Sequence, residues 1–211
     1  DFAKIAFAKV GRKPAGTVVI LVGEGLALGP QAKDLKLDAL ISRAGATAEF
    51  TGKAKTTLDL LAPADSPLDR LILVGTGTGD EIADGKGADN GGAEGNGWVN
   101  LGGLAMGALG KTKAATVLFE RPDGKKPGRG PAADFALGMK LRAYAFDNYK
   151  IEKEGEPKKK TATITVSVAD LADAQAAWVA RGAIADAVLF ARDLVNEPPN
   201  VLGPVEFADR A

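Results

Sequence analysis

The sequence predicts an α/β protein with a mixed, partly parallel sheet, helices on both faces of that sheet, and a long connecting helix after it. Three observations support this prediction. Strand-like and helical patterns alternate along the chain, which is typical of layered α/β folds. Thr17–Val22 is a continuous run rich in β-branched residues, as in a strand covered on both faces. A helical pattern from Asp170 to about Val195 is long for a helix that packs only on its own domain.

The elements before the long helix follow from apolar periodicity and from Gly and Pro punctuation. We expect strands at Phe2–Lys9, Thr17–Val22, Thr57–Leu61, Arg70–Val74 and Ala115–Phe119. We expect helices at Asp34–Arg43 (ended by Gly45), Trp98–Leu109 and Pro131–Leu141, and a β pair formed by Asn148–Lys153 and Thr161–Val168.

The helix at Trp98–Leu109 contains Gly102, Gly103 and Gly107, each of which costs about 1 kcal/mol of helix propensity relative to Ala. We expect these glycines to let the helix approach a neighbour closely. Trp98 and Trp178 lie on helix faces, where packing is the better interpretation than ligand stacking.

The long helix divides the chain into three expected parts: an α/β domain at 1–168, a connecting helix at 169–197, and the start of a further, truncated domain at 198–211. Asp170 is the expected N-cap, and Pro198 with Pro199 ends the helix. Spacing of three and four residues predicts one apolar face, made of Ile184, Ala187, Val188, Ala191, Leu194 and Val195.

Composition narrows the classes of partner and compartment. The 211 residues include 27 basic and 27 acidic side chains, a balance that argues against nucleic acid as the main partner. Two basic clusters, Lys125-Lys126-Arg129 and Lys158–Lys160, lie in expected surface loops. The sequence has no Cys, no signal-peptide pattern and no apolar run of about 18 residues, which fits a cytoplasmic protein without a membrane span.

The chemistry available in the sequence is sparse. It has no His and no Cys, so a Ser-His-Asp triad, His-based zinc sites and thiolate nucleophiles are excluded. Ser42, Ser66 and Ser167 do not stand in a nucleophile-elbow pattern. The acidic residues are scattered through loops. We therefore assign no catalytic, cofactor-binding or metal-binding residue and predict that this chain alone is inactive.

One stretch, Gly75–Gly97, has the composition of a ligand site. It begins Gly-Thr-Gly-Thr-Gly-Asp-Glu after a strand, and a glycine turn there can present N–H groups to a phosphate. However, Asp80 stands where a dinucleotide motif needs Gly, and Asp80, Glu81, Asp84, Asp89 and Glu94 add repelling charge. A surface loop is the preferred interpretation. For Arg192, Asp193, Asn196 and Glu197, we prefer helix-end capping or docking to another domain over catalysis.

Several segments resemble the leucyl aminopeptidase family. Ala191–Leu202, with Pro204 and Phe207, is similar to the string that opens the catalytic domain in that family. Tyr144–Lys150 resembles its Tyr-x-Phe-Asp-x-Tyr-Lys segment, and Asp69–Gly75 and Trp98–Leu109 resemble its bacterial members in order and spacing.

The resemblance implies a macro-domain-like amino-terminal domain whose parent is a two-metal exopeptidase. In such a parent, zinc or manganese activates water, and the metal ligands and catalytic residues lie beyond residue 211. It also implies a cytoplasmic homohexamer with the amino-terminal domains at its corners, so this part would serve assembly and substrate access. Residues 198–211 would then begin the catalytic domain. The glycine-rich Gly75–Gly97 stretch departs from the shorter loop of that family.

Two other functions stay open at this point. The domain could act alone as a macro-domain-like module that binds a nucleotide or ADP-ribose at its glycine loops. It could also be a scaffold whose long helix docks a partner through its apolar face.

Overall fold

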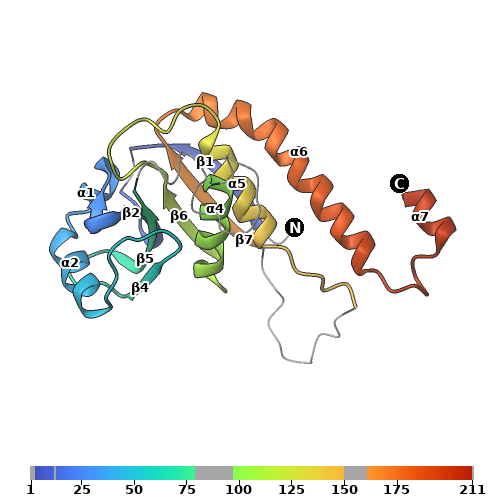
Figure 1. Ribbon diagram of the computed structural model, residues 1–211, viewed down its shortest axis with the longest axis horizontal. Helices are drawn as coiled ribbons and strands as arrows, with labels where there is room; N and C mark the ends of the chain where they lie inside the picture. The colour runs from blue at the N-terminus through green and yellow to red at the C-terminus, as the bar shows by residue number, and fades with distance from the viewer. Residues whose placement is uncertain (1–2, 12, 79–96, 150–160, 211) are drawn as a thin grey trace.

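The computed structural model describes residues 3–11, 13–78, 97–149 and 161–210, and these residues form a seven-stranded sheet with helices on both faces (Figure 1). The strand order is β1-β7-β6-β2-β5-β4, with β3 paired to β2. Strands β1, β7, β6, β2 and β5 are parallel to one another, whereas β3 and β4 are antiparallel to their neighbours. The predicted mixed α/β fold is therefore confirmed. The strands are β1 (Ala3–Lys9), β2 (Gly16–Gly23), β3 (Ala27–Leu28), β4 (Thr57–Leu61), β5 (Leu68–Gly77), β6 (Ala114–Leu118) and β7 (Ala162–Val168).

The central strand β2 is buried on both faces, as its continuous apolar run predicted. Val18, Ile20 and Val22 belong to one hydrophobic cluster, and Val19 and Leu21 belong to another. Because side chains alternate across a strand, these two sets point to opposite faces of the sheet. Each face therefore needs its own layer of helices.

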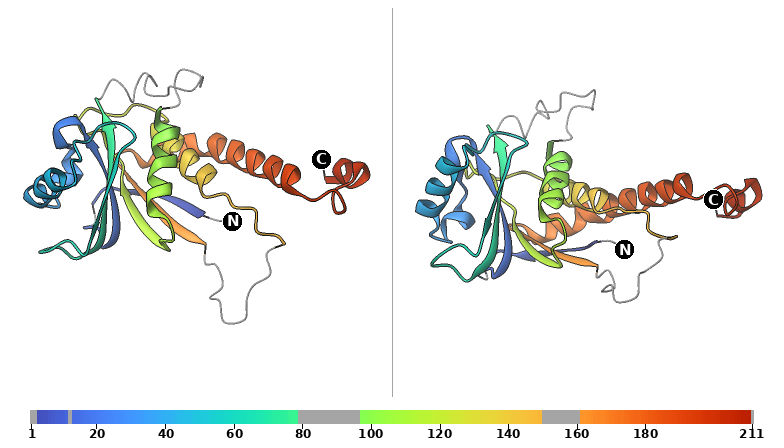
Figure 2. Two further views of the ribbon diagram at one scale, coloured as in Figure 1. Left: turned by 60° about the horizontal axis from the view of Figure 1, so that its bottom comes forward. Right: turned by 90° about the horizontal axis from the view of Figure 1, so that it is seen from below.

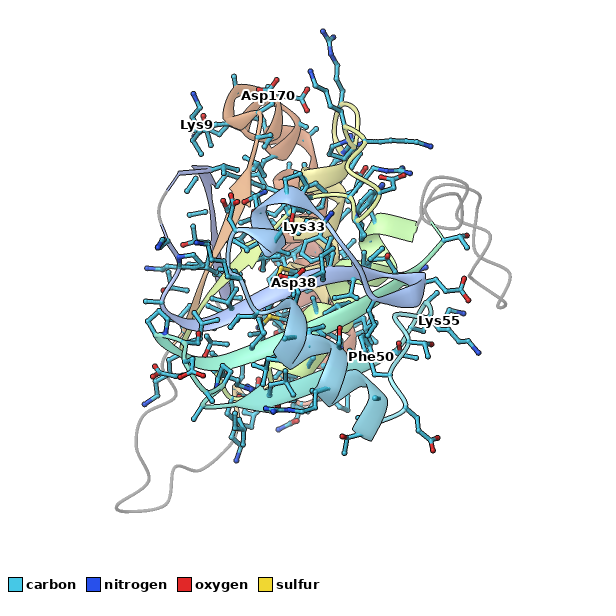
Figure 3. All side chains as sticks on the ribbon, turned by 90° about the vertical axis from the view of Figure 1, so that its left-hand side faces the viewer. Lys9, Lys33, Asp38, Phe50, Lys55 and Asp170 are labelled. Carbon is cyan, nitrogen blue, oxygen red and sulfur yellow. The ribbon has the colours of Figure 1, made fainter. Side chains whose placement is uncertain are left out.

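One face is covered by α1 (Pro30–Lys33) and α2 (Asp38–Thr47), and the other by α4 (Gly97–Leu109), α5 (Pro131–Arg142) and α6 (Leu171–Asn196). Figure 3 shows the first layer from its own side, with Lys33 and Asp38 labelled on α1 and α2. It also labels Lys9 and Asp170 close together, where the parallel strands β1 and β7 end. Figure 2 shows the two helical layers on opposite sides of the sheet.

Helices α4 and α5 pack closely because each has a glycine that lies directly against the backbone of the other helix. A Cβ on Gly102 would lie 1.9 Å from the carbonyl oxygen of Phe135, and one on Gly138 would lie 1.8 Å from that of Val99. A Cβ on Gly103, in contrast, would have its nearest neighbour at 3.8 Å. The expected close approach of the Trp98–Leu109 helix is thus confirmed, and Gly102 is the glycine that requires it.

The two tryptophans pack against other rings, as expected. Trp98 is buried, and its ring centroid lies 5.0 Å from that of Phe119. Trp178 on α6 meets Phe7 of β1 edge-on, at 5.8 Å between centroids. This second contact holds the first half of α6 against the sheet.

Two of the predicted elements are wrong. The helix expected at Asp34–Arg43 begins only at Asp38, as α2, because the chain turns after α1, where Lys36 has a φ of 57°. Gly45 lies inside α2 rather than after it, because it is buried against Leu26 and the Phe50 carbonyl, where a side chain would be crowded.

The second error concerns Asn148–Lys153 as the partner of Thr161–Val168. Strand β7 instead lies between β1 and β6 and pairs in parallel with both. Asn148 and Tyr149 form a turn, and residues 150–153 lie outside the described residues. The alternating pattern identified the strand correctly, but its partners are far away in the sequence.

Helix α6 has 26 residues and extends well beyond the sheet (Figure 2). Asp170 is its N-cap, as predicted, and accepts a hydrogen bond from the Asp173 N–H at 3.0 Å. At 1.5 Å per residue the helix is roughly 39 Å long, in line with the long helix expected here. A short helix that the sequence did not suggest, α7 (Pro204–Arg210), follows Pro198 and Pro199.

Candidate functional site at the junction of the domain and the long helix

The side of α6 that faces the domain is held by a row of polar contacts to α5. The Arg181 guanidinium donates to Asp134 at 2.7 Å, and the Lys140 ammonium donates to Asp186 at 2.5 Å. At least one side chain of each pair is substantially exposed, so each pair contributes modestly to stability. Together they set the angle at which α6 leaves the domain.

Tyr144 is the centre of the contacts at the far end of this row. Its hydroxyl donates to Asp193 at 2.9 Å and accepts from the Asn196 amide at 3.2 Å. The Arg192 guanidinium lies over the Tyr144 ring, 5.6 Å from its centroid, and donates to the Leu141 carbonyl at 2.8 Å. Desolvation, and then the hydrogen bond to the Asp193 carboxylate, raise the pKa of the Tyr144 hydroxyl. This proton therefore stays in place at neutral pH.

A second tyrosine extends the network into the segment after α6. The Tyr149 hydroxyl donates to the Glu197 carboxylate, which also accepts from Arg210 of α7 at 3.2 Å. The hydrogen bond from Tyr149 lowers the pKa of Glu197, and the same bond raises the pKa of Tyr149. Two of the segments that carry the family resemblance, 191–202 and the described part of 144–150, thus meet in the structure at this junction.

A cleft of about 380 Å³ opens beside Tyr144, between α4, α5 and α6. Two guanidinium groups, two glycines and apolar side chains line it: Val99, Asn100, Gly103, Gly138, Leu141, Arg142, Tyr144 and Arg192. Among the described residues that line the cleft, the charged side chains are those of Arg142 and Arg192. Such a surface suits an acidic group better than a metal ion or a base.

The first glycines of the glycine-rich stretch, Gly75 and Gly77, pack against the backbone of residues 52–56. The N–H groups of Gly75 and Gly77 donate to the carbonyls of Thr56 and Gly52, and a Cβ on Gly75 would lie 2.1 Å from the Lys53 carbonyl. These two N–H groups are engaged and do not face a phosphate. Residues 79–96, with the acidic positions Asp80, Glu81, Asp84, Asp89 and Glu94, lie outside the described residues.

The crevice at the carboxyl ends of β6 and β7, where open α/β sheets usually bind ligands, holds a carboxylate of the protein itself. Buried Glu120 accepts the N–H groups of Gln31 and Ala32, both at 2.8 Å. Ser167 donates to the Gln31 side chain at 3.1 Å. Desolvation raises the pKa of Glu120, although the two N–H donors act in the opposite direction. The N–H groups at the start of α1 are therefore already engaged by a carboxylate of the protein.

Metal-binding chemistry is not built into the described part of the chain. Within residues 3–11, 13–78, 97–149 and 161–210, no group of three or more His, Cys, Asp or Glu is placed to hold an ion. The basic residues Lys125, Lys126 and Arg129 are exposed in a loop, as predicted, and Lys158–Lys160 lie outside these ranges. No helix in these ranges is both long and apolar enough to cross a bilayer.

The fold and the junction define an α/β domain with a connecting helix at its carboxyl end. Residues 18–153 match the family described as cytosol aminopeptidase family, N-terminal domain. The chain therefore belongs to the cytosol aminopeptidase family and contains its amino-terminal domain.

Curated relatives agree with this assignment, and solved structures share the fold. Probable cytosol aminopeptidases from Rhizobium rhizogenes and Xanthobacter autotrophicus are 39% and 40% identical over 99% and 98% of this chain. The chain spans about 40% of the length of these curated relatives. A tomato leucine aminopeptidase mutant shares the fold with a TM-score of 0.74 at 18% identity, over 98% of this chain and 41% of that one. The bottromycin maturation enzyme BotP in complex with Mn shares the fold with a TM-score of 0.63 at 23% sequence identity. The match covers 93% of this chain and 35% of that one.

The sequence identified the residues of the junction but not their partners. Arg192, Asp193, Asn196 and Glu197 were expected to cap the helix end or to dock to another domain, and in the structure they contact residues 141–149 of the preceding α/β domain. The Glu120 cluster and the cleft beside Tyr144 gave no signal in the sequence. A Glu directly after a buried strand was the one available clue to a buried carboxylate.

Proposed function

We propose that this chain is the amino-terminal, non-catalytic portion of a two-metal leucyl aminopeptidase, and that it serves assembly and substrate access. The observation that carries the proposal is the match to family members of which the chain spans only about 40%. The junction supports it as well, because the family-like side chains Asp193 and Glu197 hold α6 in place and face no ligand set.

The chemistry of the parent enzyme would come from two divalent ions, zinc or manganese, that activate a water molecule for attack on the peptide. The described residues of this chain do not fit such a pair, because their carboxylates are dispersed or engaged with Tyr, Arg and backbone N–H groups. No step of hydrolysis is therefore assigned to this chain. Its share is to position the catalytic portion.

The proposed organisation has three parts: the α/β domain at 1–168, the connecting helix at 169–197, and the first residues of the catalytic domain at 198–211. The partners would be the catalytic domain of the same polypeptide and further copies in a cytoplasmic homohexamer, with peptides as substrates. The zero formal charge favours neither nucleic acid nor an acidic membrane surface.

Hydrolysis of Leu-p-nitroanilide in the presence of manganese or zinc tests the proposal. The Rhizobium rhizogenes relative serves as the full-length positive control. We expect the relative to release p-nitroaniline and the 211-residue chain to release none. Metal-dependent release by the pure chain would show that the active site lies within these residues and would refute the proposal.

The module that binds ADP-ribose or a nucleotide is tested by calorimetry on the same chain. The contacts of Glu120 and of Gly75 and Gly77 occupy the donors that a phosphate would use, so we expect no saturable heat. Saturable binding at micromolar ligand would instead favour the free-standing module.

A further inference from the structure

Helix α6 is unusual because its charged side chains share the domain-facing side with the buried residues Ala174 and Ala185 and with Trp178. Its charged side chains point toward its own domain, where each meets a partner: Asp173 accepts from Gly130, Arg181 meets Asp134, Asp186 meets Lys140, Arg192 meets Leu141, and Asp193 meets Tyr144. In a surface helix, the charged side normally faces water and the apolar side faces the core.

Between Ala176 and Val195, the side of α6 that faces away from the domain has no charged residue. Nine exposed side chains with helical spacing make up what we call the α6 stripe: Ala176, Val179, Ala180, Ala183, Ile184, Ala187, Phe190, Ala191 and Val195. Val179 is 76% exposed and Val195 is 85% exposed. At about 100° per residue, all nine fall within one side of the helix. A continuous apolar stripe of this kind on a soluble chain marks an interaction surface.

We infer that the α6 stripe is the docking surface for the catalytic portion that follows this region in the longer relatives. The inference rests on the proposed function. Its first support is position: after α6 the chain turns, and α7 lies on the side of α6 away from the sheet (Figure 1). Its second support is continuity, because α7 adds the exposed side chains Val205 and Phe207. The polypeptide after α7 would thus begin near the carboxyl end of the stripe (Figure 2).

The composition of the stripe describes the surface that fits it. Five of its nine residues are alanines, so the backbone of a partner element can approach α6 closely, as Gly102 and Gly138 allow between α4 and α5. No charge is available to pair with a charged partner, so the facing surface should be apolar. The larger side chains Ile184 and Phe190 would enter hollows between the side chains of the partner.

Hydrogen exchange compares the stripe in two proteins: the 211-residue chain and the product of the complete coding sequence that contains it. We expect amides of residues 179–195 to exchange at least about tenfold more slowly in the longer protein, because docking opposes local opening of the helix. Amides of β2, buried in both proteins, provide the internal reference. Equal exchange of residues 179–195 in both proteins would overturn the inference.

A pair of matched substitutions separates docking from simple misfolding. Ala187→Arg places a charge in the middle of the stripe, whereas Ala46→Arg places it on α2, which lies on the opposite face of the sheet. Both alanines are exposed in this chain, so both variants should keep its unfolding midpoint within about 2 °C. In the longer protein, Ala187→Arg alone should lower the midpoint, by about 5 °C or more.

The outcomes distinguish this inference from the proposed function. A longer protein that is active but in which Ala187→Arg and Ala46→Arg behave alike refutes docking and leaves the aminopeptidase assignment intact. Protection of the stripe in a longer protein that lacks metal-dependent peptidase activity refutes the assignment and leaves docking intact. If sedimentation shows that the 211-residue chain is a dimer which Ala187→Arg dissociates, a second copy covers the stripe and the inference is wrong.

Discussion

The close contact between Gly102 and the Phe135 carbonyl allows us to predict how a substitution at Gly102 changes the stability of this domain. A Cβ at position 102 would lie 1.9 Å from that oxygen, whereas a carbon atom normally stays about 3.3 Å away. The Gly102→Ala variant must therefore separate α4 from α5 by roughly 1.4 Å. Their shared interface includes Leu101, Ala105 and Met139, all of which are buried, so the separation loosens the core on this face of the sheet.

The magnitude follows from two opposing effects. Overpacking a close contact typically costs 1–3 kcal/mol, and a clash with a backbone atom belongs at the upper end, about 3 kcal/mol. Replacing Gly by Ala inside a helix returns about 1 kcal/mol. We therefore expect Gly102→Ala to lower the free energy of unfolding by about 2 kcal/mol. For a chain of this size, that corresponds to a fall of about 4–8 °C in the unfolding midpoint.

Gly103 supplies the matched control in the same helix. Its added Cβ would have its nearest neighbour at 3.8 Å, an ordinary contact, so the gain in propensity should dominate. Gly103→Ala should raise the free energy of unfolding by up to about 1 kcal/mol. Urea unfolding followed by Trp fluorescence measures both variants, since Trp98 lies in α4. Equal stability of the two variants would refute the reasoning that backbone contact fixes the α4–α5 distance.

Three further predictions concern polar groups. Asp123→Asn should cost about 1 kcal/mol at pH 7, after allowance for solvent screening. Hydrogen bonding to Arg121 lowers the pKa of Asp123 to about 2, so this contribution to stability is present above pH 4 and is lost as the pH falls toward 2. In urea titrations, the difference in unfolding free energy between Asp123→Asn and the unchanged chain should therefore disappear in acid. Glu120→Ala should cost about 2 kcal/mol in the same assay, because two N–H groups of α1 lose their acceptor. Tyr144→Phe should speed amide exchange at the end of α6 several-fold and leave β2 unchanged, because the hydroxyl that donates to Asp193 is lost; unchanged exchange there would show that this bond does not hold the helix.

The sequence predicted the parts of the fold that depend on local pattern. The run at Thr17–Val22 predicted a strand buried on both faces, and Asp170 predicted the start of α6 to the residue. Strand partners were less predictable, because pairing joins segments that are far apart. The strand at 162–168 was placed correctly, yet its neighbours are β1, over a hundred residues earlier, and β6.

The junction shows the same limit for the candidate site. The segments 144–150 and 191–202 were each recognised through a family resemblance, but nothing in their composition indicated that Tyr144 would bond Asp193 and Tyr149 would bond Glu197. Those contacts depend on how α5 and α6 are aligned. Tertiary contacts between the two helices, such as those of Arg181 and Lys140, determine this alignment. The periodicity of α6 likewise revealed an apolar face, but not that its charged side would be the one in contact with the domain.

The two sides of the carboxyl half of α6 differ in the contacts that can stabilise them. On the domain side, the ion pairs of Arg181 and Lys140 are partly exposed and each contributes at most about 1 kcal/mol. On the outer side, burial of Val179 or Val195, which are 76% and 85% exposed, would contribute about 1–2 kcal/mol each. Burial of the outer side would therefore stabilise the carboxyl half of α6 more than the ion pairs on the domain side do. The polar contacts and Trp178 hold the helix on its domain, and a docked apolar surface would add the larger share of stabilisation to its carboxyl half.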